Sequence, residues 1–151
     1  MPKFVTDKDI RFFHLISREL VDDVVENLIV LYKIILDASA TNIYGESDSK
    51  TYYEGVQVAA LIERDDNVAV SEGFGIDSNQ NLRFKMLRDT LEDKGIYPEI
   101  GDYVGFNNSY YEIDNVIENQ FIAGQPVNNY SIVCPAHLSR NTTLNIQGRN
   151  I

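Results

Sequence analysis

Apolar residues near the start of the chain recur at helical spacing. The main row, at intervals of three and four, is Phe13, Ile16, Leu20, Val24, Leu28, Leu31 and Ile35. A second row, which widens the first, is Val21, Val25, Leu28 and Tyr32. This pattern predicts an amphipathic helix of about 20–30 residues. We expect Thr6 to cap it, because acids follow in the first turn. Ser17 offers a second start, which would split the helix into Asp7–Ile16 and Arg18–Leu36.

Two roles are open for this helix. It could cover the β-core of its own subunit, or its segment Ser17–Leu36 could pack against a neighbouring subunit. A helix of this length has more apolar surface than one end of a small barrel can cover, which favours a partner. Val25 and Tyr32 are the candidate contact residues on it.

The helical period breaks between Asp37 and Tyr53, where glycine, serine and aspartate predict a loop. Aromatic residues on a loop offer large, rigid contact area, although they could equally fold back onto their own core. The candidate partner contacts in the loop Asn42–Tyr53 are Tyr44, Glu46, Tyr52 and Tyr53.

The middle of the chain alternates apolar and polar residues, which is typical of strands with one buried face. The strands expected from this pattern are Gly55–Glu63, a short one through Val68 and Val70, and one through Leu82, Phe84 and Met86. Ser71–Gln80 reads as a loop. A short helix should begin at Asp89 as its cap and end at Gly95.

A β-hairpin is predicted over Gly101–Val116. Asn107-Asn108 supplies its turn, because Asn tolerates the positive φ values of tight hairpin loops. Val116 falls out of phase with Tyr111 and Ile113, and a β-bulge at Asp114-Asn115 would return it to the inner face.

The last predicted strands are a short one at Phe121-Ile122 and a longer one from Tyr130 to Leu138. Pro135 lies inside the longer one and lacks an N–H for the ladder, so that strand should be an edge strand or a kinked one. The tail after Leu138 is polar and reads as an extended arm that is ordered only where something holds it.

The elements together predict an α+β, mainly β fold. We expect an antiparallel β-barrel or sandwich of about six strands, with a long N-terminal amphipathic helix and an extended C-terminal arm. The 151 residues form a single domain, divided into a helical arm (1–37), a loop (38–54), the β-barrel (55–138) and the C-terminal arm (139–151).

The net charge, the N-terminal sequence and the cysteine content limit the classes of function that the protein could have. The net charge of −10 argues against a protein that grips nucleic acid by its phosphates, but not against one that DNA slides past. The N-terminus lacks a signal-peptide pattern, and no apolar run is long enough to span a bilayer, so a cytoplasm-like compartment and no membrane partner are expected. The single cysteine, Cys134, should be a buried small hydrophobe.

The sequence offers only weak evidence for catalytic or binding residues. His14 and His137 have no metal-ligand spacing with Cys134. Gly73-Phe-Gly75 lacks the strand-to-helix setting of a phosphate loop. Acid pairs such as Glu112 and Asp114 arise by chance among 23 acids. We therefore expect no enzyme activity, cofactor or metal.

Three segments carry a resemblance to a known family. They are Asn42-Ile-Tyr-Gly-Glu-Ser47 with Lys50 and Tyr52, then Leu61-Ile-Glu-Arg64, then Gly101-Asp-Tyr-Val104 followed by Tyr111-Glu-Ile-Asp-Asn-Val116. From about Leu20 to about Leu138 the chain resembles the neck proteins (head-completion or head-closure connectors) of contractile-tailed bacteriophages. The Tyr-Gly-Glu-Ser segment is the more specific of these motifs.

The resemblance implies a β-barrel subunit that assembles as a ring, expected to be a hexamer, around the DNA channel. It would bind the portal or adaptor ring on one side and the tail terminator on the other, with DNA passing without sequence-specific contacts. It would be assembled in the host cytoplasm and reside at the head–tail joint of the virion. A tail-terminator role is a close alternative. A small β-barrel module that binds a peptide or small ligand is an alternative of another class.

Overall fold

The computed structural model describes residues 6–36, 40–41, 47–64, 69–72, 75–78, 80–122, 125–139 and 145–147. The chain begins with helix α1 (Asp7–Glu19), which continues into a π-helical turn, η1 (Leu20–Val25). Thr6 caps α1 as predicted. Its hydroxyl accepts the Asp9 N–H at 3.4 Å, and its own N–H donates to the Asp9 carboxylate at 3.1 Å, which completes a capping box.

The helical segment ends at Val25, so the predicted helix to Leu36 is wrong in its second half. Glu26 adopts a left-handed conformation with φ of 48°, and its N–H donates to the Val21 carbonyl at 3.2 Å. Strand β1 (Leu28–Tyr32) follows. This segment is an unbroken apolar run that contains β-branched Ile29 and Val30, a composition typical of a buried strand, and its match to helical spacing is coincidental.

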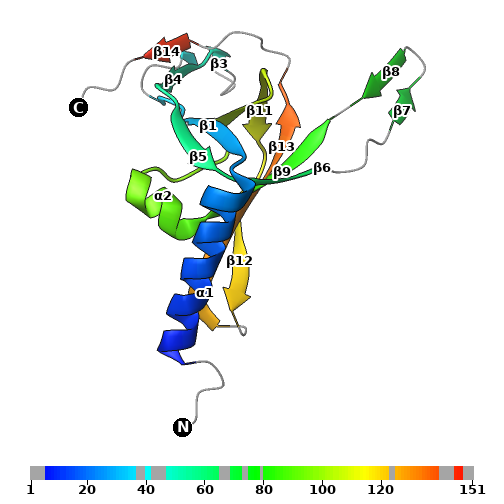
Figure 1. The fold of residues 1–151 in the computed structure, drawn as a ribbon. Coiled ribbons are helices and arrows are strands. Elements are labelled where there is room, and N and C mark those ends of the chain that lie inside the picture. The colour runs from blue at the N-terminus through cyan, green and yellow to red at the C-terminus, as the bar shows by residue number, and fades with distance from the viewer. Residues whose placement is uncertain are drawn as a thin grey trace.

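The main sheet is an antiparallel barrel, as predicted. Its strands are β1, β5 (Val56–Ala59), β6 (Leu61–Arg64), β9 (Asn81–Leu87), β10 (Tyr103–Phe106), β11 (Ser109–Ile113), β12 (Ile117–Ile122) and β13 (Gln125–Leu138). They pair in the order β5-β1-β10-β11-β13-β9-β6, and β12 pairs with β13 off this path. Figure 1 shows α1 and the β12–β13 pair extending from the same end of the barrel.

One segment closes the barrel. β5 and β6 are consecutive and separated only by Ala60, yet β5 pairs with β1 while β6 pairs with β9. The Ala60 N–H donates to the Asn27 carbonyl at 2.9 Å, at the bend between the two halves. The pairing path therefore begins and ends on the same stretch of chain, as in a closed barrel.

The core fills the barrel with buried side chains from six of the seven strands of its path, and the partly buried Ile62 of β6 packs against them. Alternate residues point inward, which the predicted two-residue period requires. The buried core residues are Ile29, Leu31, Val58, Ala60, Leu82, Phe84, Met86, Leu91, Ile96, Val104, Tyr111, Ile113, Ile132, Cys134 and Ala136.

The β10–β11 hairpin is confirmed, with Asn107 and Asn108 at φ of 47° and 63° in its turn. The bulge after it is also confirmed. Ile113 pairs with Ala136, whereas Ile117 pairs with Val133, so four residues on one side span only three on the other. The extra residue returns Val116 to the core.

Pro135 was expected on an edge strand or on a kinked strand, and the first of these is wrong. Its strand, β13, pairs with β9 on one side and with β11 and β12 on the other. The Pro135 carbonyl accepts the Asp114 N–H at 2.9 Å. Since the N and C=O of a strand residue point to the same neighbour, the missing Pro135 N–H faces the bulge, where the ladder is interrupted.

Asp102 is a buried carboxylate that ties β1 to the start of β10. Its side chain is fully buried and accepts the N–H groups of Ile34 at 3.0 Å and Glu99 at 2.8 Å. Lys33 Nζ lies 3.4 Å from the same carboxylate and 3.0 Å from the exposed Glu99 carboxylate. Burial raises the pKa of Asp102, and these donors oppose the rise.

Smaller elements surround the barrel. They are β2 (Ala40–Thr41), β3 (Ser47–Ser49), β4 (Thr51–Tyr53), β7 (Ala69–Glu72), β8 (Gly75–Ser78), α2 (Arg88–Lys94) and β14 (Asn145–Gln147). β7 and β8 pair where a loop was predicted over Ser71–Gln80. Helix α2 is capped by Leu87, not Asp89, and ends at Gly95 as predicted. β14 pairs in parallel with β4, so this part of the tail is held against the subunit.

Candidate assembly interface

Helix α1 is attached to the subunit through polar side chains. His14 Nδ1 lies 2.8 Å from the Asp89 carboxylate, and Arg18 donates to Asp93. Just beyond, the Thr90 hydroxyl donates to Asp22 at 3.4 Å. Every one of these contacts joins the N-terminal arm to α2. Because the charged pairs are partly exposed, each contributes only about 0–1 kcal/mol to stability.

Much of the apolar row along α1 and η1 is exposed to solvent, although Phe13 and Leu20 also line a groove toward the barrel. No residue of α1 is buried. Four residues at intervals of four carry exposed fractions of 46% to 70%, and we call them the outer stripe: Phe12, Ile16, Leu20 and Val24. A surface helix normally turns its apolar side toward the core. Here the polar side is attached to α2 and Phe13 turns toward Tyr130 on the barrel, whereas the outer stripe stays about half exposed or more, which marks an interaction surface.

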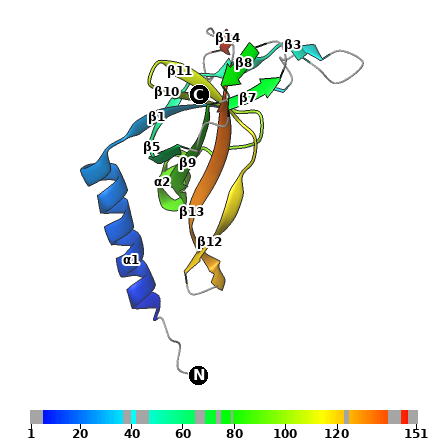
Figure 2. The ribbon, with the colours of Figure 1, turned by 90° about the vertical axis from the view of Figure 1, so that its right-hand side faces the viewer.

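A groove separates α1 from the barrel. Its volume is about 330 Å³, and its walls are Phe13, Ser17, Leu20, Val21, Leu61, Lys85, Met86, Leu87, Tyr130 and Ser131. The rings of Phe13 and Tyr130 meet edge to face, with centroids 5.1 Å apart. Figure 2 shows α1 standing at one margin of the molecule, with α2 and β13 on its inner side.

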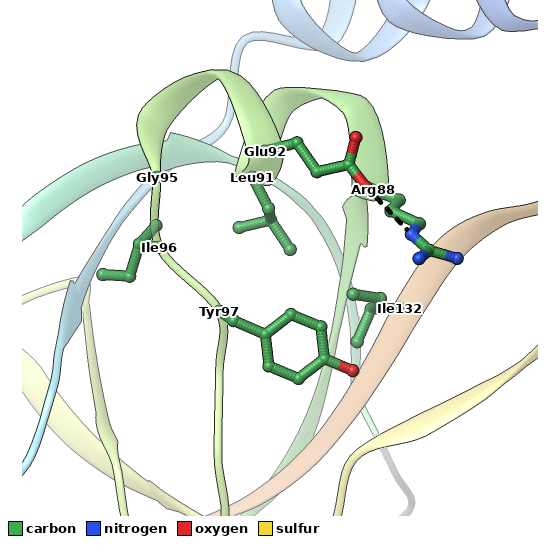
Figure 3. Close-up of a pocket in the computed structure, with 7 residues that line it drawn as sticks. All are labelled: Arg88, Leu91, Glu92, Gly95, Ile96, Tyr97 and Ile132. Carbon is green, nitrogen blue, oxygen red and sulfur yellow. Dashed lines mark hydrogen bonds and ion pairs between the residues drawn. The ribbon is translucent and has the colours of Figure 1, made fainter.

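A second, smaller cavity lies beside α2. It measures about 220 Å³ and is lined by Arg88, Leu91, Glu92, Gly95, Ile96, Tyr97 and Ile132. In Figure 3 the Tyr97 ring lies near Leu91 and Ile132, and the Arg88–Glu92 ion pair of 3.1 Å stands at the rim. This volume is below the range of about 300–1,000 Å³ that is usual for small-molecule sites.

The predicted contact residues on the N-terminal segment lie on two different elements. Val25 ends η1 and is half-buried. Tyr32 lies on β1, half-buried, with its ring edge-on to Tyr110 at 5.8 Å between centroids. Burial raises the pKa of Tyr32. The structure therefore does not bring these two residues onto one helical face.

The predicted contacts of the Asn42–Tyr53 segment divide by burial. Tyr44 and Glu46 lie outside the described residues. Tyr52 is 1% exposed and stacks on Tyr103 with centroids 4.7 Å apart, and burial raises its pKa. Tyr53 is exposed. In the subunit on its own, Tyr52 belongs to the scaffold and Tyr53 is the residue that a partner could reach.

The histidine and cysteine side chains considered in the sequence lie in different parts of the molecule. His137 Nδ1 lies 2.6 Å from the exposed Asp114 carboxylate, on the outside of the barrel. Cys134 is fully buried in the core, as predicted, and burial raises its pKa to about 12. Among the described residues, no group of three or more His, Cys, Asp or Glu is placed to hold a metal ion. No helix in the described part of the chain is long and apolar enough to cross a membrane.

Sequence reasoning identified the apolar row but not its direction. The outer stripe shares Ile16, Leu20 and Val24 with the predicted row, whereas Phe12 was not included. Polar partners on α2, far away in sequence, decide which side of α1 faces the body. Sequence reasoning named Asp102 only as part of the Gly-Asp-Tyr-Val motif and gave it no role. An acidic residue directly before the apolar residues of a strand is the signal that could have identified it.

Comparison with known proteins adds information on the fold. No family model and no curated protein matches this sequence. Among solved structures, a chain from the virion of a native gene transfer agent (GTA) particle superposes with a TM-score of 0.51 at 13% identity. The match covers 76% of this chain and 94% of that chain. The two chains share one fold. At this identity the likeness concerns the fold alone.

Proposed function

We propose that this protein is a structural component of a virion and has no enzymatic role. The observation that carries the proposal is the match of nearly the whole of a virion chain, 94% of its length, to 76% of this chain. The outer stripe supports it, because an apolar helix face left open on a subunit is suited to contact with other proteins of an assembly.

Within the virion, we assign the protein to the neck. It forms a ring, expected to be a hexamer, between the portal or adaptor and the tail, closes the filled head and joins it to the tail. The resemblance of the Tyr-Gly-Glu-Ser and Gly-Asp-Tyr-Val segments to phage neck proteins supports this position. A net charge of −10 suits a wall past which DNA slides, since acidic side chains repel phosphate.

Two experiments on particles test this function. Mass spectrometry of purified virions should detect the protein at a few copies per particle, and its absence would refute a virion role. Deleting its gene should leave filled heads and separate tails. Normally joined particles after deletion would exclude the neck. A reconstruction with its density on the tail side alone would reassign it to the tail terminator.

A further inference from the structure

A strained residue joins the arm, by which we mean α1 and η1 together, to the barrel. Glu26 follows η1 with φ of 48°, in the left-handed region that residues other than glycine seldom adopt. Its N–H donates to the Val21 carbonyl at 3.2 Å, which closes the turn back onto the arm. The next residue, Asn27, is already fixed to the barrel, because its carbonyl accepts the Ala60 N–H at 2.9 Å. Glu26 is therefore a short hinge in a strained, bent conformation.

The surface that holds the arm is built without the hinge. Of the arm residues, all of which the structure describes, Val21 alone is buried. It packs in a cluster with Ala59 of β5 and Leu87 of β9. Around this anchor, polar side chains of α1 contact Asp89 and Asp93 of α2. These partners all lie far beyond Glu26 in the chain, so the docking surface is complete whichever copy of the protein supplies the arm.

We propose that two copies of the chain exchange their arms. The hinge at Glu26 extends, and α1 and η1 of each copy dock on α2 and the barrel of the other. The arm then makes on the second copy the contacts that it makes within its own subunit, including the Arg18–Asp93 pair and the burial of Val21. Only the hinge differs, and its extension releases the left-handed conformation.

Three observations favour exchange with a second copy. The arm leaves its site at low cost, since no residue of α1 is buried and its charged contacts are partly exposed. The site matches this arm in charge, because the acids Asp89 and Asp93 face His14 and Arg18. Figure 2 shows α1 at the margin of the molecule, with no other described element outside it. Closure within one chain benefits from a high effective concentration, so we expect exchange where copies are concentrated.

The inference goes beyond the proposed neck role and does not depend on it. Exchange is a property of the free chain at high concentration. Within a ring, the same contact would tie each subunit to its neighbour. Arm exchange between free copies and presence in the virion can each fail without the other.

Two substitutions at the exposed hinge should act in opposite directions. Glu26→Pro excludes a positive φ, because the proline ring fixes φ at about −65°. It should lower the dissociation constant of the dimer by roughly tenfold. Glu26→Gly removes the strain from the closed turn and should raise that constant by a similar factor. Light scattering measures the rise from 17.2 kDa toward twice that mass. Equal dimerisation of wild type and both variants, or 17.2 kDa for all three at every concentration, would overturn the inference.

Mixing two charge-reversed chains tests exchange without changing the hinge. Arg18→Glu and Asp93→Arg each set like charges together, both within one chain and between identical copies. In an equal mixture, exchange sets each arm against a body of opposite charge in both directions. Native mass spectrometry, with one chain isotopically labelled, should therefore find mixed dimers favoured over either homodimer by roughly tenfold.

The matched control is a mixture of Arg88→Glu and Glu92→Arg chains. This ion pair lies within α2, so exchange of arms cannot restore it, and mixed dimers should form only at their statistical share. Circular dichroism should show that all four variants are folded. A statistical share in the Arg18→Glu and Asp93→Arg mixture as well, or no dimer in that mixture, would overturn the inference.

Discussion

Replacing Asp102 with asparagine should lower the free energy of unfolding by about 2 kcal/mol. The carboxylate is fully buried and accepts two backbone N–H groups, from Ile34 and Glu99, on its two separate oxygens. Asparagine has one oxygen, so one buried N–H would face an amide NH₂ and lose its acceptor. An unsatisfied buried donor of this kind costs about 1–3 kcal/mol.

The matched control is Glu99→Gln, since Glu99 and Asp102 share Lys33. The Glu99 side chain is 61% exposed, so its ion pair should contribute less than about 1 kcal/mol. Urea and thermal unfolding, followed by circular dichroism, measure both variants. For a domain of this size, a loss of about 2 kcal/mol corresponds to a fall of about 4–8 °C in Tm. Equal effects of the two substitutions would refute the role given to burial.

The difference in stability between wild type and Asp102→Asn should depend on pH with a definite sign. Burial raises the folded pKa of Asp102 above its ordinary value of 3.8. A carboxyl group whose pKa is raised on folding stabilises the fold at pH values below its ordinary, unfolded pKa. This contribution is lost as the pH rises through the folded pKa. Asparagine does not titrate. The stability gap between wild type and Asp102→Asn should therefore be wider at about pH 4 than at about pH 7. A gap that widens with rising pH would contradict this reasoning.

Three further predictions concern packing and reactivity. Phe84→Ala should cost about 3–5 kcal/mol in urea unfolding, because a fully buried ring that meets Phe106 and Tyr111 would leave a cavity. Gly55→Ala should cost about 1–3 kcal/mol by the same assay, since its Cβ would lie 2.3 Å from Val30 Cγ1, and a cost near zero would show that β1 yields easily. Cys134 should resist iodoacetamide in the native protein and react on unfolding in guanidinium, because it is buried with a pKa of about 12, and rapid native labelling would contradict this.

Local rules predicted the features of this fold that depend on near neighbours in sequence. The Asn107-Asn108 turn and the bulge after Ile113 follow from backbone preference and from side-chain phase over a few residues. The first strand was missed because five consecutive apolar residues, Leu28–Tyr32, fit helical and strand patterns equally. Pairing with β5 and β10, both far along the chain, decides the outcome.

The candidate interface was less predictable for a related reason. Helical spacing shows that an apolar stripe exists but not which way it points. That direction depends on Asp89 and Asp93, about 75 residues beyond their partners on α1. Burial of Tyr52 likewise depends on a distant ring, Tyr103. Composition alone does not distinguish an aromatic residue that stacks inside its own subunit from one that is exposed and contacts another subunit.

The bend at Ala60 has a consequence for behaviour at high concentration. Because one segment supplies both ends of the pairing path, the unpaired edges along that path belong to β5 and β6, which are only four residues long each and offer a poor template for another chain. Strand addition to the native barrel is thereby disfavoured, whereas a partly unfolded chain that had lost β5 and β6 from the sheet would expose the longer edges of β1 and β9 at once. Resistance to fibril formation should thus follow the stability of this one corner more closely than the hydrophobicity of any strand.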